Sequence, residues 1–334
     1  MKILLVAKPW RGGLAGYVYR ALDDLFPGEV EWWPTRPIRL TERAAFLRDR
    51  RGWYRRLRDR LAVADADVIL FINHLPIFDE LPNCSRQVLW LTDGPKPRPG
   101  ELAAYGRVCL TDSGYSGEVA AVVGNRFGGE VSFGFSPTIH VPRPRPSKQQ
   151  DVCFIGNRDL KRDRYLSALL TGGFRPTVIG NYFLHHSLFW RYPGCFRPAV
   201  ANERMGRIYA DHKVSLNIHA DVVRRGTNMR TFECAAYGIP QLIEDRPGLE
   251  AFFISGDEIA TFVEVEELQE QLVRLLSDPV TASAMALRAR RRVFKEHSYH
   301  HRCVALLEGV LPDKLLQGRL AALTRSGGVL EFPC

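Results

Sequence analysis

Short apolar runs alternate with amphipathic stretches through the first half of the chain. The apolar runs lie at 2–7, 68–72, 88–91, 108–111 and 131–133, and runs of this kind are typical of strands buried on both faces. Apolar residues at helical spacing predict helices at 15–25, 41–61 and 116–123. Alternation of strands and helices predicts a parallel sheet covered by helices on both faces.

A second alternating set begins at residue 151. It predicts strands at 151–156, 177–179, 214–218 and 241–243, and helices at 162–170, 203–210, 229–237, 265–276, 281–295 and 300–311. Between the two sets, prolines exclude helix and central strand and indicate a linker. We therefore expect two α/β domains. The N-terminal domain would span 1–140 and the C-terminal domain 151–310, with a linker at 141–150. A tail at 311–334 can return to the first domain.

The helix expected at 229–237 has recognisable signals at both ends. Thr227 or Asn228 can cap its start, and Gly238 can end it in a left-handed conformation. The free N–H groups at a helix start suit a phosphate. Glu233, further along the helix, is poorly placed for that anion but well placed for a group attached to it, such as a sugar hydroxyl.

Composition is that of a soluble globular protein. The 334 residues are 46% hydrophobic and 25% charged, and no run of apolar residues is long enough for a membrane-spanning helix. The apolar start at 2–7 is too short for a signal peptide. The seven cysteines are scattered and never spaced as CxxC, which favours reduced thiols in a cytoplasmic protein over zinc or a disulfide framework.

The net charge of +9 indicates an anionic partner, such as a nucleotide, a nucleic acid or an acidic membrane surface. Arginines are concentrated at 36–60, where only Glu42, Asp49 and Asp59 oppose them. The plainer interpretation of this arginine-rich segment is a helix face exposed to solvent. The alternative is a docking surface for a phosphate-rich or lipid-bound acceptor.

Two loops could approach a ligand at the carboxyl ends of strands. The first contains Gly12 and Gly13 but fits neither a dinucleotide-binding fingerprint nor a P-loop, and an ordinary tight turn explains it equally well. The second places Arg158, Lys161 and Arg162 after the first strand of the second domain. Because arginine grips phosphate bidentately and lysine acts as a point charge, these three cations predict a phosphate site.

Candidate catalytic residues follow three strands of the first domain. His74, Asp93 and Asp112 each come directly after an apolar run, at the sheet edge where catalytic groups gather. Each could instead be a turn or capping residue, and Asp112 with Ser113 is typical of a helix cap. Asp65-Ala66-Asp67 matches a metal-binding DxD only superficially, because a strand follows at once, and we expect no metal site.

Three segments together resemble the GT-B glycosyltransferases, in the group related to the spore-maturation protein CgeB and the group 1 glycosyl transferases. They are DVCFIGN at 151–157, KVSLNI at 213–218 and NMRTFECAAYG at 228–238. The resemblance implies two Rossmann-like domains that face each other across a cleft. It also implies a UDP-, GDP- or dTDP-sugar donor on the second domain, an acceptor on the first, and catalysis without metal or further cofactor.

The resemblance also implies roles for particular residues. Glu233 would bind the ribose hydroxyls, and His74 would contact the donor sugar. The leaving diphosphate would be neutralised by Arg158, Lys161 or Arg162, and Arg230. An acidic residue found in retaining relatives is replaced here by Arg225, so retention and inversion both stay open. An inverting reaction needs a base, for which the candidates are Asp93, His74 and Asp112.

The expected activity is hexosyl or pentosyl transfer by a cytoplasmic enzyme, with peripheral membrane association as an alternative location. Other functions stay open. A sugar-nucleotide epimerase on the same fold would need no acceptor, which leaves the arginine-rich segment unexplained. A basic nucleic-acid-binding protein and a glycosyltransferase that modifies DNA would both explain the charge. The acceptor is unknown, and polyanionic and membrane-associated molecules are both candidates.

Overall fold

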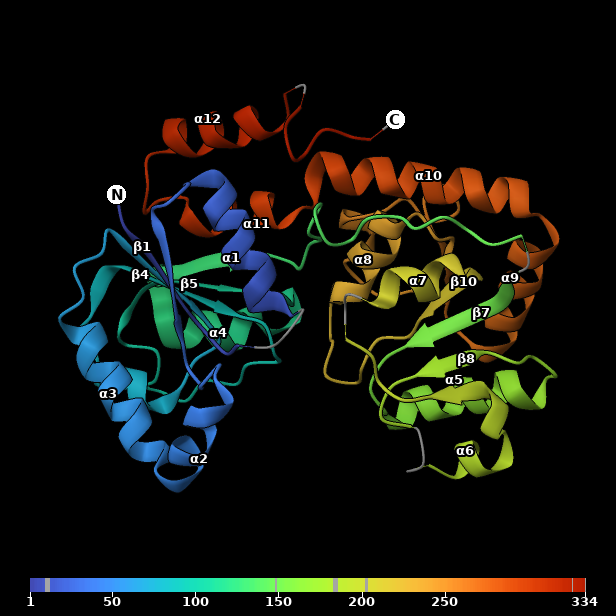
Figure 1. Ribbon diagram of the computed structural model, residues 1–334, viewed down its shortest axis with the longest axis horizontal. Helices are drawn as coiled ribbons and strands as arrows, with labels where there is room; N and C mark the ends of the chain where they lie inside the picture. Colours follow the sequence, from blue (N-terminus) through green and yellow to red (C-terminus); the bar gives the residue numbers. More distant parts are fainter. Residues whose placement is uncertain (10–12, 148, 183–185, 202–203, 326, 334) are drawn as a thin grey trace. The chain divides into compact units, whose positions relative to one another are not determined.

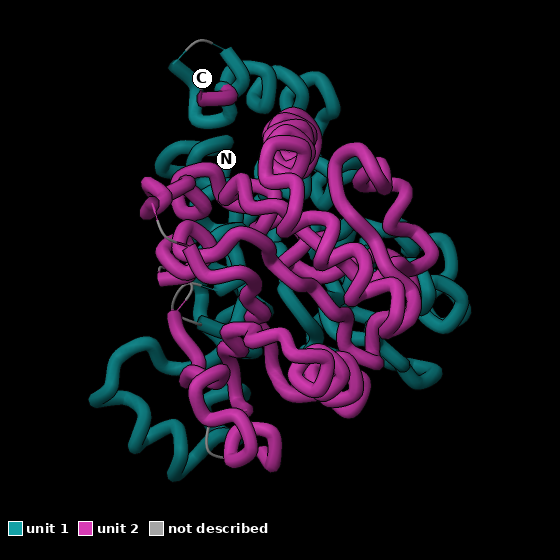
Figure 2. The backbone as a smooth tube through the Cα atoms, turned by 90° about the vertical axis from the view of Figure 1, so that its right-hand side faces the viewer, with its two compact units in different colours: residues 1–132, 299–331 teal, residues 133–298, 332–334 magenta. Residues whose placement is uncertain are grey.

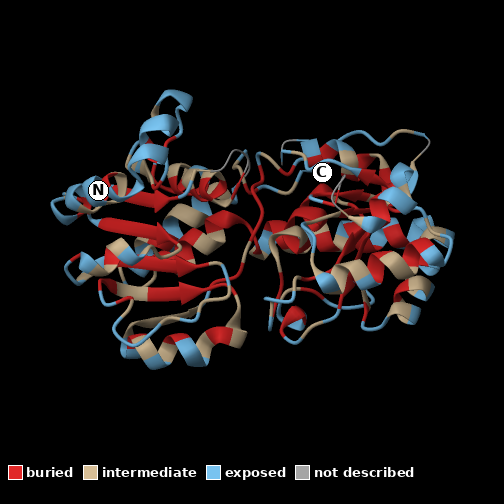
Figure 3. Cartoon of the chain, turned by 90° about the horizontal axis from the view of Figure 1, so that it is seen from below, coloured by how far each residue is buried: buried red, intermediate tan, exposed pale blue. Residues whose placement is uncertain are grey.

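The chain forms two compact units, each built on a parallel six-stranded sheet. The structure is a computed structural model that describes residues 1–9, 13–147, 149–182, 186–201, 204–325 and 327–333. Unit 1 consists of residues 1–132 and 299–331, and unit 2 of residues 133–298 and 332–334 (Figure 2). In both units the central strands are largely buried and most helices expose their outer faces (Figure 3).

The sheet of unit 1 has the strand order β2-β1-β3-β4-β5-β6, and Figure 1 labels β1, β4 and β5 of this sheet. The inner strands β1 and β3 are apolar and buried throughout, as expected where helices cover both faces. The strands are β1 Ile3–Ala7, β2 Val30–Pro34, β3 Val68–Ile72, β4 Cys84–Leu91, β5 Tyr105–Leu110 and β6 Phe127–Glu130. The helices are α1 Leu14–Leu25, α2 Leu40–Arg48, α3 Arg50–Ala62, α4 Ser116–Val123, α11 Tyr299–Leu307 and α12 Asp313–Leu323.

The sheet of unit 2 has the order β12-β11-β10-β7-β8-β9. Its strands are β7 Gln150–Ile155, β8 Thr177–Ile179, β9 Phe196–Arg197, β10 His212–Asn217, β11 Gln241–Glu244 and β12 Ala260–Phe262. Its helices are α5 Leu160–Thr171, α6 Ser187–Arg191, α7 Met205–Ala210, α8 Met229–Tyr237, α9 Val265–Ser277 and α10 Pro279–Glu296. Parallel α/β architecture is therefore confirmed for both halves of the chain.

The last helices of the chain belong to unit 1. The Tyr299 ring of α11 stacks on Tyr17 of α1 with ring centroids 5.6 Å apart. His300 Nε2 lies 2.8 Å from Asp24 Oδ2, just before the end of the same helix α1. The return to unit 1 thus begins at residue 299, earlier than the tail expected from residue 311.

The segment expected as an interdomain linker at 141–150 lies in unit 2. Upstream of it, the Phe135 N–H donates to His297 O over 3.1 Å, and the Phe135 ring packs on Phe294. Within it, Arg145 donates to Gly238 O over 2.6 Å. Phe135 is thus held at α10 and the proline-rich stretch at the end of α8, and the unit boundary falls between residues 132 and 133.

Several element boundaries differ from the sequence predictions. The single helix expected at 41–61 is broken into α2 and α3, because Asp49 caps a new helix by accepting from Gly52 N over 2.7 Å. The strand expected at 131–133 is wrong, since β6 ends at Glu130. No described helix is long and apolar enough to cross a membrane.

Candidate functional site

The carboxyl edge of the unit 2 sheet gathers the loops after β7, β10 and β11. These three strands are neighbours and run parallel, so their ends meet at one edge. The loops lead into α5, whose start is capped by Asp159, and into α8, whose start is capped by Asn228. Ligands of open α/β sheets bind at this edge.

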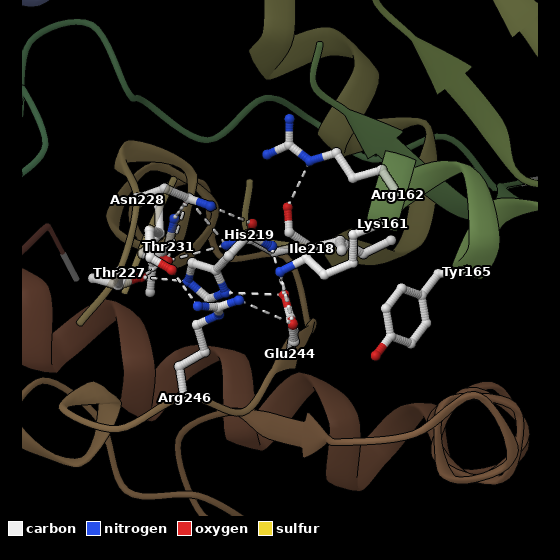
Figure 4. A network of polar contacts seen from close by, with 12 residues as sticks. Lys161, Arg162, Tyr165, Ile218, His219, Thr227, Asn228, Thr231, Glu244 and Arg246 are labelled. Carbon is white, nitrogen blue, oxygen red and sulfur yellow. Dashed lines mark hydrogen bonds and ion pairs between the residues drawn. The ribbon is translucent and has the colours of Figure 1, made fainter. Parts of the chain in front are cut away.

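Glu244 is the centre of a polar network at this edge (Figure 4). Lys161 Nζ lies 2.9 Å from both of its carboxylate oxygens, and the His219 N–H donates to Oε2 over 2.9 Å. Arg246 Nη2 lies 3.6 Å from Oε1. Burial alone would raise the pKa of Glu244, but the hydrogen bonds from His219 and Lys161 outweigh it and lower the pKa to about 2.

Cations exceed carboxylates in this network. Burial lowers the pKa of Lys161, and the Glu244 carboxylate opposes that shift. The Arg162 guanidinium donates from Nε to Ile218 O over 2.9 Å and from Nη1 to Asn157 O over 2.8 Å. Both acceptors are neutral carbonyls, so the charge of Arg162 is left for another anion.

Arg158, the third predicted phosphate ligand, is held differently. Its Nε lies 3.1 Å from Asp163 Oδ2, and its side chain is 44% exposed. His186 Nε2 lies 3.1 Å from the same carboxylate oxygen. Arg158 therefore pairs with Asp163 at the edge of the network and does not contact Glu244.

The start of α8 is built from side chains that bond to one another. Asn228 Oδ1 accepts from Thr231 N over 3.3 Å, and Asn228 Nδ2 donates to Asn217 Oδ1 over 2.9 Å. Thr227 is buried and bonded to Thr231, and its Oγ1 lies 3.3 Å from His219 Nε2. The predicted cap at Asn228 and the left-handed end at Gly238 are confirmed.

Glu233 differs from the open carboxylate that the resemblance implies. Its side chain has no exposed surface. One carboxylate oxygen is bonded to Arg230, and the other lies 3.6 Å from His140 Nε2. The reason is the position of α8, whose residues 231–237 are all buried. Arg230 itself is 27% exposed, and although burial opposes it, the Glu233 charge raises the Arg230 pKa.

The structure places two of the three predicted catalytic residues of unit 1 in one cavity of about 220 Å³. His74 and Asp93 line it together with Asn73, at the ends of β3 and β4. Asn73 Nδ2 donates to Asp93 Oδ2 over 3.2 Å, and Asn73 has a positive φ of 62°. Strained backbone of this kind gathers at functional sites.

His74 is engaged at both ring nitrogens. Nδ1 lies 2.9 Å from Tyr105 Oη, and Nε2 lies 3.2 Å from Asp79 Oδ2. Burial lowers the pKa of His74, and Asp79 offsets part of that shift. A neutral ring held on both sides has no nitrogen left to accept a proton from an acceptor hydroxyl.

The remaining predicted residues lie elsewhere. Asp112 caps a short 3-10 helix by accepting from Gly114 N over 2.9 Å, as its sequence context indicated. Gly13 precedes α1 in extended backbone, and Gly12 lies outside the described residues. Within the described ranges, no three His, Cys, Asp or Glu side chains gather as metal ligands. Metal independence stays a prediction.

Sequence reasoning missed Glu244, Arg246 and His219. Each lies at or just after the end of a predicted strand, which is the same signal that selected His74 and Asp93. The position of Glu244 directly after the apolar Leu242 and Ile243 could have identified it.

Comparison with known proteins identifies related folds. Residues 161–308 match the model of the glycosyl transferase-like family. Curated protein sequences offer no match to the chain.

Solved structures similar to the chain are glycosyltransferases of low sequence identity. Sucrose-phosphate synthase from Thermosynechococcus elongatus is 13% identical with a TM-score of 0.66, over 96% of this chain and 100% of that one. A glycosyltransferase from Rickettsia africae is 10% identical with a TM-score of 0.64, over 95% and 98%. HepE from Anabaena in complex with UDP is 12% identical with a TM-score of 0.62, over 97% and 100%. The chain thus has the GT-B glycosyltransferase fold, and its residues 161–308 match the glycosyl transferase-like family.

Proposed function

We propose that the protein is a glycosyltransferase that moves a sugar from a nucleoside-diphosphate sugar to an acceptor hydroxyl. The observation that carries this proposal is the cationic network of Lys161, Arg162 and Arg246 at the carboxyl edge of the unit 2 sheet. UDP is the favoured donor nucleotide, since HepE structures hold UDP and UDP-glucose. The matched family and folds do not favour an epimerase or a nucleic-acid-binding protein.

In the proposed complex, the donor diphosphate lies between Arg162 and Lys161, near the first turn of α8. Cations placed in advance where negative charge develops would stabilise the departing nucleoside diphosphate. Arg162 suits this role because, among the described residues, its guanidinium donates to two neutral backbone carbonyls, lies over the Phe154 ring and forms no ion pair. Lys161 would exchange part of its contact with Glu244 for a phosphate oxygen.

Arg230 and Glu233 act as a pair in this proposal. Arg230 lies in the first turn of α8 and is partly exposed, whereas Glu233 is fully buried. We propose that Glu233 orients the Arg230 guanidinium toward the donor instead of touching the ribose in this conformation. Because the carboxylate faces His140, a direct contact with ribose would require that buried contact to open.

On the acceptor side, we propose Asp93 as the base if the reaction inverts. It is exposed, it lines the cavity of unit 1, and Asn73 holds one of its oxygens. His74 lacks a free nitrogen and Asp112 is a cap. The anomeric configuration of the product, read by NMR, decides between inversion with a base and retention without one.

Calorimetry with UDP, GDP, dTDP and CMP tests the donor site. We expect the Arg162→Met variant to bind UDP about 10- to 100-fold more weakly, because a charge-assisted hydrogen bond contributes about 1.5–3 kcal/mol. Arg164→Met is the matched control, since Arg164 lies two residues further on and pairs with Glu264 at the surface. No binding of any nucleotide, or equal losses in both variants, would contradict the proposed site.

A further inference from the structure

The helices α2 and α3 carry a cationic surface that the proposed donor site does not use. Nine arginines of 36–60 are exposed, and six of these have neither a partner carboxylate nor an aromatic ring beneath them within the described part of the chain: Arg36, Arg39, Arg43, Arg48, Arg51 and Arg55. The other members pair with Asp49, Asp59 or Glu80, or lie over the Phe46 and Trp33 rings. The uncompensated charges require an anionic partner or solvent.

Helix α2 also exposes an apolar stripe. Phe46 is its only buried residue and packs edge-on against Trp53 and Tyr54 of α3. Leu40 is 75% exposed and Leu47 is 62% exposed. They are seven residues apart, with Ala44 between them at helical spacing, so all three lie on one face. That face is directed away from the buried Phe46.

Arginines flank this stripe on both sides. At 100° per residue, Arg43 and Arg48 fall on opposite sides of the line from Leu40 to Leu47. Ile38, just before the helix, is a further exposed aliphatic residue at 57%. Exposed aliphatic side chains bordered by cations suit the headgroup region of a membrane, where the aliphatic groups can reach the acyl boundary and the cations can meet lipid phosphates.

We infer that α2 and α3 form a docking surface for an anionic lipid bilayer. The aliphatic residues would enter the boundary between headgroups and acyl chains, and the arginines would contact lipid phosphates. A nucleic acid is disfavoured, because exposed aliphatic side chains add nothing to phosphate contacts, and base stacking needs exposed aromatic rings. Lipid binding by this surface does not depend on the proposed transfer reaction.

Vesicle cosedimentation of the full chain tests this surface. We expect binding to vesicles of phosphatidylglycerol and phosphatidylcholine, no binding to phosphatidylcholine alone, and release as the salt rises from about 0.05 M to about 0.5 M. The Arg39→Glu, Arg43→Glu, Arg48→Glu variant should bind about 100-fold or more weakly, since each basic residue contributes about 1 kcal/mol near an anionic surface.

A second variant isolates the apolar contribution. Ile38→Ser, Leu40→Ser, Leu47→Ser keeps every charge and should bind anionic vesicles about 10-fold more weakly. Two matched controls alter other exposed residues: Arg204→Glu, Lys314→Glu, Arg325→Glu for charge, and Val222→Ser, Val273→Ser, Val280→Ser for apolar surface. Both controls should bind as the wild type does.

Three outcomes would overturn this docking surface. The first is absence of binding to anionic vesicles. The second is an equal loss in the test and control variants. The third is unchanged vesicle binding by the serine variant together with equally tight binding of double-stranded DNA, which would identify a general polyanion surface. Thermal unfolding of each variant checks its fold, and we expect little change because the altered side chains are exposed.

Discussion

Lys161 and Glu244 are 83 residues apart in sequence, yet Lys161 Nζ lies 2.9 Å from both oxygens of the Glu244 carboxylate. The pair joins the first turn of α5, which follows β7, to the end of β11 across the intervening strand β10. The ion pair therefore fixes the distance between two loops at the proposed donor site. The Glu244 carboxylate also favours the charged form of Lys161, which burial disfavours.

Replacing Glu244 by Gln should lower the free energy of unfolding at pH 7 by about 2–3 kcal/mol. The folded protein keeps the pKa of Glu244 at about 2, below its ordinary value of 4.5, so the folded state favours the deprotonated form. This stabilisation is complete above about pH 5 and is lost as the pH falls toward about 2. Urea unfolding of both proteins across this range measures it.

The difference between wild type and Glu244→Gln should therefore shrink as the pH falls. Glu264→Gln serves as the control, because Glu264 is exposed and pairs only with Arg164 at the surface, and it should change stability by less than about 0.5 kcal/mol. A difference that is constant with pH would show that the Glu244 charge does not stabilise the fold.

Glu233→Ala should destabilise the fold by about 3 kcal/mol or more, because it leaves the Arg230 charge without its buried partner. In Arg230→Met, Glu233→Ala both charges are absent, and we expect part of that stability to return relative to Glu233→Ala. Denaturant unfolding of the two single variants and the double variant gives the coupling energy. A double variant as unstable as the sum of its parts would argue against a coupled pair.

Asp93→Asn should lower kcat about 100-fold or more if Asp93 is the base, with UDP affinity unchanged. Asn73→Gly keeps a residue that tolerates the positive φ and removes the hydrogen bond to Asp93, so kcat should fall less, by about 10-fold. His74→Gln should lower stability more than kcat, since both ring nitrogens are bonded inside unit 1. Full activity of Asp93→Asn would remove Asp93 from the reaction.

Chelation should leave the activity intact. If cationic side chains neutralise the departing diphosphate, EDTA in excess over any bound divalent ion leaves kcat unchanged. The assay follows UDP release with and without EDTA. Complete loss with recovery on addition of manganese would instead indicate a metal-dependent reaction.

Much of the fold could be predicted because its helices and strands have local signals. β3 and α8 have the predicted boundaries, since an apolar run marks the first and capping residues mark the second. The sequence pattern did not predict the edge strands β2 and β12, because they are short and only partly apolar. The break between α2 and α3 depends on one side chain, Asp49, whose preference for a cap outweighs helix continuation.

The candidate site was less predictable. Lys161 and Arg162 were found from their position after a strand, but their partners at Glu244 and Ile218 follow from strand order, which no local pattern specifies. The expectation that Glu233 reaches a sugar hydroxyl rests on its position along the helix and on the family resemblance, and neither indicates how deeply the helix is buried. The structure buries the helix on all sides from residue 231 onward, and the carboxylate then requires Arg230.

The chain enters unit 2 at residue 133 and returns to unit 1 at residue 299. Unit 1 is therefore not a continuous segment, and a fragment that stops near residue 140 lacks the helix that stacks Tyr299 on Tyr17. During synthesis, residues 133–298 emerge from the ribosome before α11 has been made. Unit 2 can therefore fold first, while the apolar face of α1 still lacks the helix that covers it. The unit whose translation begins first therefore receives two of its helices, α11 and α12, only after residues 133–298 of unit 2 have been made.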